Sequence, residues 1–213
     1  MRAARPLSAL PPTAARPEPG GGARLLPEPD HPVPTGPEGA PAVLTAPEAA
    51  VARGLSPEDL LGHLGSTTLL LEEALGCPLS VRLLERRTAT ASELPARVSR
   101  LLGLARSAPV IVRRSEMSAA DGIPVSRNLV VSDARTPRYL AEILSDPRTP
   151  LGRALAATAG SGSRRIVSCG RTPWDGEGTG VGDAPCRDYL IRLPEAPPLY
   201  VAERFRPGLA GAP

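Results

Sequence analysis

The feature that most constrains how this chain can fold is an Asp-Gly pair, Asp121-Gly122, between two runs of strand-forming residues. The first run is PVIVRRSEMSA (109–119) and the second is IPVSRNLVVS (123–132). Asp-Gly flanked by apolar runs is the strongest short-range signal for a β-hairpin. We therefore expect two antiparallel strands here, and the rest of the fold must be built around them.

The remaining periodic segments predict both helices and strands. Helices are expected in LSPEDLLGHLGSTTLLLEEALG (55–76, two short helices, the second capped by Ser66 or Thr67), SELPARVSRLLGL (92–104), TPRYLAEILSD (136–146) and RTPLGRALAATAG (148–160). Strands are expected from about residue 79 and in RRIVSCGR (164–171), CRDYLIRL (186–193) and PLYVAERFR (198–206). Helices cluster in the first half, and hairpin-length links join most strands. This pattern predicts an α+β fold, an antiparallel sheet with helices packed on one face.

The distribution of proline along the sequence predicts the domain boundaries. Twelve of the 27 prolines fall in residues 1–50, which contain no helical or strand periodicity. We predict a disordered, Pro-rich tail over 1–50, one domain over 51–207, and a disordered end over 208–213. The tail has no apolar stretch of signal-peptide or membrane-span length, so we expect a cytoplasmic protein without a membrane partner.

The charged residues narrow the chemistry. All 25 basic side chains are arginine, so Schiff-base chemistry and P-loop phosphate binding are excluded. The net charge is only +3 and the basic residues are scattered among few aromatics, which argues against a nucleic-acid partner. Two histidines and three cysteines without ligand spacing predict neither a metal site nor a catalytic triad. Arginine suits carboxylates and phosphates, so we expect an organic anion as ligand.

Two charged residues lie on apolar strand faces. Alternation places Glu203 with Leu199, Val201 and Phe205, and it places Arg114 with Val110 and Val112. A buried lone carboxylate needs a partner, so Arg114 is a candidate partner for Glu203 or for an anion between them. The alternative is that Arg114 and Glu203 are exposed strand charges or a structural pair.

Gly152 lies inside the first turn of the helix expected after Thr149 and Pro150, where glycine weakens a helix by roughly 0.5–1 kcal/mol. One explanation is that a ligand approaches the main chain there. The other is that the glycine permits close packing between helices.

From Leu60 to Phe205 the chain resembles the chorismate pyruvate-lyase family and its UTRA-like relatives. The resemblance rests on DGIPVSRNLVV, TPLGRAL, Gly170-Arg171 and PPLYVAERF. It implies a sheet with helices on one side, an enclosed ligand, and conversion of chorismate into 4-hydroxybenzoate and pyruvate without metal or cofactor. The family's essential arginine and glutamate fall on Arg114 and Glu203, and its main-chain ligand contacts fall on Leu151 and Thr67.

The resemblance therefore implies that Arg114, with the main-chain N–H groups of Leu151 and Thr67, holds a carboxylate of chorismate, while Glu203 assists proton movement. We expect a monomer. The Gly-rich loop 172–185 has no counterpart in the family. Relatives also include sensor domains of transcription regulators, which bind small effectors without reaction. Since no helix-turn-helix precedes the domain and both charges are present, the sequence favours the enzyme over the sensor.

Overall fold

The computed structural model describes residues 51–52, 54–158, 162–174 and 182–210. The predicted tail 1–50, the middle of the Gly-rich loop (175–181) and the last three residues lie outside this range. The helices are α1 (Pro57–Gly62), α2 (Thr67–Leu75), the 3₁₀ turn η1 (Ala91–Glu93), α3 (Ala96–Leu101), α4 (Arg138–Ser145) and α5 (Leu151–Thr158). The strands are β1 (Ser80–Thr90), β2 (Pro109–Ser118), β3 (Pro124–Asp133), β4 (Ser163–Pro173), β5 (Asp183–Arg192) and β6 (Leu199–Phe205).

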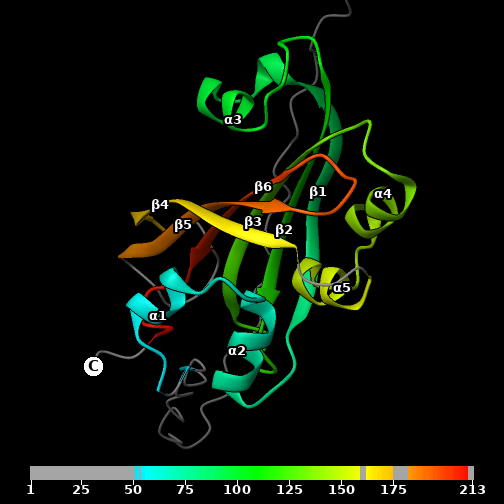
Figure 1. Ribbon diagram of the computed structural model, residues 1–213. Coiled ribbons are helices and arrows are strands. Elements are labelled where there is room, and N and C mark those ends of the chain that lie inside the picture. The colour runs from blue at the N-terminus through cyan, green and yellow to red at the C-terminus, as the bar shows by residue number, and fades with distance from the viewer. Residues whose placement is uncertain (1–50, 53, 159–161, 175–181, 211–213) are drawn as a thin grey trace, which may run out of the picture. The chain divides into compact units, whose positions relative to one another are not determined.

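The six strands form one antiparallel sheet in the order β1-β2-β3-β6-β5-β4. The predicted hairpin joins β2 to β3, and Gly122 supplies the positive φ (77°) that the turn needs. Asp121 Oδ1 accepts a hydrogen bond of 2.8 Å from the Ile123 N–H, which fixes the turn locally. Strand β6 inserts between β3 and β5, so the last strand of the chain lies in the middle of the sheet (Figure 1).

The sheet is covered unequally on its two faces. We call the face that carries Ile111, Val130 and Val201 the inner face. The helices α4 and α5 pack there through Leu140, Leu144 and Leu155, and α1 and α2 pack beside them through Leu60 and Leu71, around Phe205 and Met117. The predicted α+β fold is thus confirmed, with α1, α2, α4 and α5 on this face.

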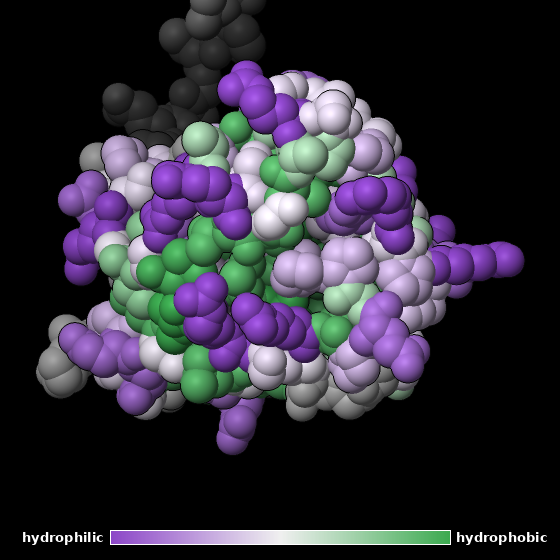
Figure 2. Space-filling model, turned by 45° about the horizontal axis from the view of Figure 1, so that its top comes forward, coloured by the Kyte–Doolittle hydropathy of each residue, from purple (hydrophilic) through white to green (hydrophobic). Residues whose placement is uncertain are grey.

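The outer face carries Val110, Val112 and Val131, and the short helix α3 covers part of it with Val98 and Leu102. In Figure 1, α3 lies apart from the other four helices. Figure 2 turns the α3 side toward the viewer and shows a hydrophobic area there, bordered by hydrophilic side chains. The partly buried residues that pack against the cluster under α3 are Leu94, Leu101, Leu104, Leu129, Val167 and Ala202.

The helix ends follow the sequence signals. Ser66, one of the two predicted caps, begins α2 by accepting from the Leu69 N–H, and Gly76 ends it in the left-handed region at φ 66°. Core contacts continue past the predicted boundary at 207. Leu209 is only 1 % exposed, and the Ala52 N–H donates to the Leu209 carbonyl at 2.8 Å. The apolar Leu209 belongs to the cluster around Leu60 and Phe205.

Among the described residues, no helix has the length and apolarity that a bilayer crossing requires.

Candidate functional site

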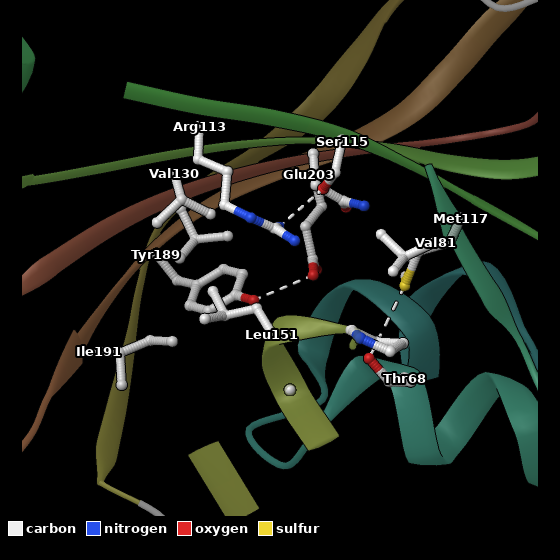
Figure 3. A pocket seen from close by; sticks show the side chains of 14 residues that line it. Thr68, Val81, Arg113, Ser115, Met117, Val130, Leu151, Tyr189, Ile191 and Glu203 are labelled. Atoms are coloured by element: carbon white, nitrogen blue, oxygen red, sulfur yellow. Dashed lines mark hydrogen bonds between the residues drawn. The ribbon is translucent and has the colours of Figure 1, made fainter. Parts of the chain in front are cut away.

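A small cavity lies between the inner face of the sheet and the facing ends of α2 and α5. The space open to the centre of a water-sized sphere is about 30 Å³, which is room for very few waters. Its walls combine apolar and polar groups, and Figure 3 shows Arg113, Tyr189 and Glu203 directed into it from the sheet. The lining residues are Thr68, Val81, Arg113, Ser115, Met117, Asn128, Val130, Pro150, Leu151, Gly152, Tyr189, Ile191, Val201 and Glu203.

Glu203 lies where its alternation predicted, on the inner face of β6, and is 5 % exposed. Both oxygens of its carboxylate accept hydrogen bonds. Oε2 accepts from Arg187 Nε at 2.9 Å and from the Thr67 hydroxyl at 3.1 Å, and Oε1 accepts from the Tyr189 hydroxyl at 3.0 Å. Buried carboxylates are stable only with such partners.

Arg187 is the ion-pair partner of Glu203, and sequence reasoning missed it. It lies on β5 directly opposite Glu203 and is 1 % exposed. Its Nη1 donates to the carbonyls of Leu60, Leu61 and His63 at 2.7–3.2 Å, where α1 ends. The signal was available, since Arg187 alternates with Tyr189 and Ile191 in the same way that Glu203 alternates with Val201.

Arg113 is the second buried cation of the site. It is 1 % exposed; Nη1 donates to Ser115 Oγ and Nη2 to the Asp146 carbonyl, both at 3.1 Å. Within the described part of the chain its Nε has no hydrogen-bond partner, and no carboxylate lies within 4.0 Å of the guanidinium. Burial lowers the pKa of Arg113, but an arginine remains charged at any physiological pH. The cavity therefore contains a cation without a counter-charge in contact.

Arg114 does not lie with Glu203. Its side chain is on the outer face, 59 % exposed, and pairs with Glu85 at 3.1 Å. The physical reason is that Val110, Ile111 and Val112 are all buried, because both faces of this part of β2 are covered. Alternation then shows which residues share a face but not which face meets the site. The pattern assigned Arg114 to the cavity, whereas the structure places its neighbour Arg113 there.

The other two predicted contacts lie at the helix ends. Leu151 and Gly152, in the first turn of α5, line the cavity, and the first N–H groups of a helix have no partner within it. Thr67 is buried but contributes its side chain to Glu203 and Arg187, while its neighbour Thr68 lines the cavity. The structure thus brings Thr67, Leu151 and Glu203 together and leaves Arg114 out.

The close approach expected at Gly152 is found, and it comes from another helix. A Cβ at Gly152 would lie 2.5 Å from Ser66 Oγ and 2.9 Å from Thr68 Oγ1, both at the start of α2. Of the two explanations that the sequence left open, the packing of helices is observed directly. The same glycine also lines the cavity, so the tight packing forms part of its wall.

Burial dominates the electrostatics of the site. It raises the pKa of the Tyr189 hydroxyl, and the adjacent Glu203 charge raises it further, so this tyrosine remains a hydrogen-bond donor. In the described ranges no three His, Cys, Asp or Glu side chains gather as metal ligands would.

Comparison with known proteins gives a likeness of fold. No protein-family model matches the sequence, and no curated protein matches it. Among solved structures, PhnF from Mycobacterium smegmatis is similar with a TM-score of 0.54 at 13 % identity, over 71 % of this chain and 69 % of that chain. The effector domain of the same PhnF is similar with a TM-score of 0.54 at 14 % identity, over 70 % of this chain and 92 % of that domain. Such identities show the fold alone, which is the α+β, six-stranded antiparallel chorismate lyase/UTRA-like fold.

Proposed function

We propose that this chain is a binding domain for a small organic anion, and that the cavity between the sheet and helices α2 and α5 is its receptor. The observation that carries the proposal is Arg113. A buried guanidinium that contacts only a hydroxyl and a main-chain carbonyl is costly, and a ligand carboxylate would supply the missing charge. The first-turn N–H groups of α5, beside Leu151, would add donors to the same anion.

The residues that line the cavity indicate the chemistry of the remaining part of the ligand. Val81, Val130, Ile191 and Val201 line the cavity from the sheet, and Leu151 lines it from α5. These apolar groups favour an aromatic or aliphatic body attached to the anionic group. A benzene ring needs more room than about 30 Å³, so we expect α5 and α2 to move outward from the sheet when the ligand binds.

Binding without reaction is the function that these contacts support best. A catalytic carboxylate must be able to exchange partners with the substrate, yet both oxygens of Glu203 already accept hydrogen bonds from buried donors. The similar PhnF structure is described as an effector domain, and we propose an effector-binding role for this chain as well.

The second candidate is chorismate pyruvate-lyase activity without a cofactor. It is favoured by one observation, that Arg113 and Glu203 border the same cavity. In that case Arg113 takes the role that the resemblance assigned to Arg114. Arg113, with the main chain near Leu151, would hold a carboxylate of chorismate. Glu203, oriented by Thr67, Arg187 and Tyr189, would accept a hydrogen bond from the ring hydroxyl.

One experiment tests both candidates. Binding of benzoate, 4-hydroxybenzoate and chorismate is measured by calorimetry for the wild type, Arg113→Met and, as the matched control on the outer face, Arg114→Met. We expect Arg113→Met to weaken binding at least tenfold, about 1.4 kcal/mol, and Arg114→Met to change it less than twofold. Arg113→Lys, which keeps the charge, separates lost recognition from lost folding.

The same samples are incubated with chorismate, and 4-hydroxybenzoate and pyruvate are measured. Binding without product supports the effector-binding role. Stoichiometric formation of both products that disappears in Glu203→Gln establishes the lyase instead. Equal affinities in the wild type and Arg113→Met would overturn the proposal that this cavity is the anion receptor.

A further inference from the structure

We infer that the ligand carries a neutral hydrogen-bond donor next to its anionic group, as a 2-hydroxycarboxylate does, and that Asn128 recognises this donor. The inference rests on the proposed function, since it assigns Arg113 to the anion. It goes further because it names the chemical class of the ligand and a second residue that selects it.

The first observation is a buried acceptor without a donor. Asn128 lies on β3 and lines the same cavity as Arg113. Its Nδ2 donates to Ser126 Oγ at 3.2 Å, whereas its buried Oδ1 has no hydrogen-bond partner among the described residues. A buried acceptor left without a partner is destabilising, and most such groups in proteins are satisfied. A donor on the ligand would satisfy it.

The second observation is the position of this acceptor relative to the cation. Asn128 is directly opposite Ser115 in the β2–β3 register, and Ser115 Oγ accepts the hydrogen bond from Arg113 Nη1. Side chains directly opposite in an antiparallel pair lie about 5 Å apart at Cβ, so the amide and the guanidinium border the same corner of the cavity. The unsatisfied Nε of Arg113 is part of that guanidinium. The donor and the anionic group of the ligand must therefore be close together.

The third observation is the charge beside the donor, which decides between a hydroxyl and an ammonium group. The donor lies next to the Arg113 guanidinium, which is 1 % exposed; among the described residues no carboxylate contacts it, and Asp146 acts on it from a longer distance. An ammonium group would add a second buried positive charge beside this cation. Like charges at a buried site are strongly unfavourable, so a hydroxyl fits and an ammonium does not.

The test compares ligands of nearly equal size. Phenylacetate, the two enantiomers of mandelate, 4-hydroxyphenylacetate and phenylglycine are titrated into the full chain. We expect one enantiomer of mandelate to bind at least tenfold more tightly than phenylacetate, because a site built around a hydroxyl rejects the analogue that lacks it. We expect the remote hydroxyl of 4-hydroxyphenylacetate to give no such gain, and phenylglycine to bind more weakly than phenylacetate.

The variants assign the effect to Asn128. In Asn128→Leu, or in Asn128→Ala if the leucine variant folds poorly, the preference for mandelate should fall below threefold. The affinity of the same variant for phenylacetate is the reference, so that the ratio of the two affinities reports the contribution of the hydroxyl. A preference for mandelate that persists in both variants would overturn the role of Asn128.

The outcomes also separate this inference from the proposed function. If phenylacetate binds in an Arg113-dependent way and mandelate binds no better, the inference is wrong and the anion receptor stands. If Asn128→Leu lowers the affinity for phenylacetate itself and the wild type shows no preference, the amide donates to the anion, which also overturns the inference. If none of the anions binds, the proposed function fails.

Discussion

At the scale of single residues, Glu203 and Arg113 are two buried charges with different surroundings. Glu203 has a guanidinium and two hydroxyls around its carboxylate, so its charge is compensated within the domain. Arg113 contacts a hydroxyl and a carbonyl, and the Asp146 carboxylate acts on it only from beyond ion-pair distance, so among the described residues its charge has no carboxylate in contact. We therefore assign Glu203 mainly to stability and Arg113 to binding.

The buried pair gives the first prediction. Glu203→Gln keeps the shape but leaves the Arg187 cation without its carboxylate, and this should lower the free energy of unfolding by about 3 kcal/mol. The double variant Arg187→Met/Glu203→Gln should lose at least 1 kcal/mol less free energy of unfolding than the two single variants lose together. Urea unfolding measures all three variants. Glu142→Gln, in the exposed pair with Arg138, is the control and should cost less than about 0.5 kcal/mol. Strict additivity would show that the pair is not coupled.

A second residue-scale prediction concerns pH. Burial, with the neighbouring Asp188 carboxylate, raises the pKa of Tyr200 to about 12, whereas an unfolded tyrosine titrates near pH 10. Between these values the unfolded state binds fewer protons than the folded state, so the free energy of unfolding decreases as the pH rises. Tyr200→Phe should remove its share of this decrease, about 1–2 kcal/mol, when urea unfolding is compared at about pH 10 and about pH 12. Identical pH dependence in the variant and the wild type would contradict the shifted pKa.

At the residue scale, the sequence pattern placed Glu203 on the face where the structure has it, but it did not distinguish Arg113 from Arg114. The face of Glu203 was readable because β6 has exposed or half-buried residues, Ala202 and Arg204, between its buried ones. On β2, the four consecutive residues 110–113 are all buried, so no alternation in burial tells whether Arg113 or Arg114 enters the cavity. The partner Arg187 was readable from its alternation with Tyr189 but requires knowing that β5 pairs with β6.

At the scale of elements, most of the structure was predictable because each signal is local. Ser66 and Gly76 mark the ends of α2, and Asp121-Gly122 marks the β2–β3 turn. The order of the strands was not predictable, because the insertion of β6 between β3 and β5 depends on contacts distant in sequence. The position of α3 on the outer face depends on the same long-range packing.

Gly152 gives the prediction at this scale. Alanine there gains about 1 kcal/mol of helix propensity, yet its Cβ would meet Ser66 Oγ and Thr68 Oγ1 at the start of α2. We expect Gly152→Ala to lower the free energy of unfolding by about 1–2 kcal/mol, because overpacking outweighs propensity. The control is Gly62→Ala at the end of α1, where nothing lies within 4 Å of the added Cβ, and it should be neutral or slightly stabilising. Thermal unfolding distinguishes them, and a Gly152→Ala protein as stable as Gly62→Ala would mean that α2 and α5 are not tightly packed.

At the scale of the whole molecule, the two ends of the described domain are joined. Ala52 forms an isolated parallel bridge with Ala210, and Ala52, Leu55 and Leu209 all belong to the cluster around Leu60 and Phe205. The burial of Leu209 could not be predicted from the sequence, since a single leucine in PGLAGAP has no periodicity to indicate burial. The helix α1, whose last carbonyls are held by Arg187, connects these ends to the site.

A series of truncations follows from this arrangement. Deletion of 1–50 removes a segment with too little apolar content to join a core, so we expect a Tm within about 2 °C of the full chain. Deletion of 1–55 also removes Ala52 and Leu55, and deletion of 208–213 removes Leu209, which is 1 % exposed. Loss of one buried leucine costs about 2–4 kcal/mol, or roughly 5–15 °C in a domain of this size. Leu209→Ala should reproduce most of the effect of the C-terminal truncation, because the buried side chain rather than the chain length is responsible. Calorimetry measures each Tm.

Two outcomes would contradict this arrangement. If deletion of 208–213 leaves the Tm unchanged, Leu209 is not part of the core and the boundary at 207 is right. A large decrease of the Tm on deletion of 1–50 would show that the tail stabilises the domain.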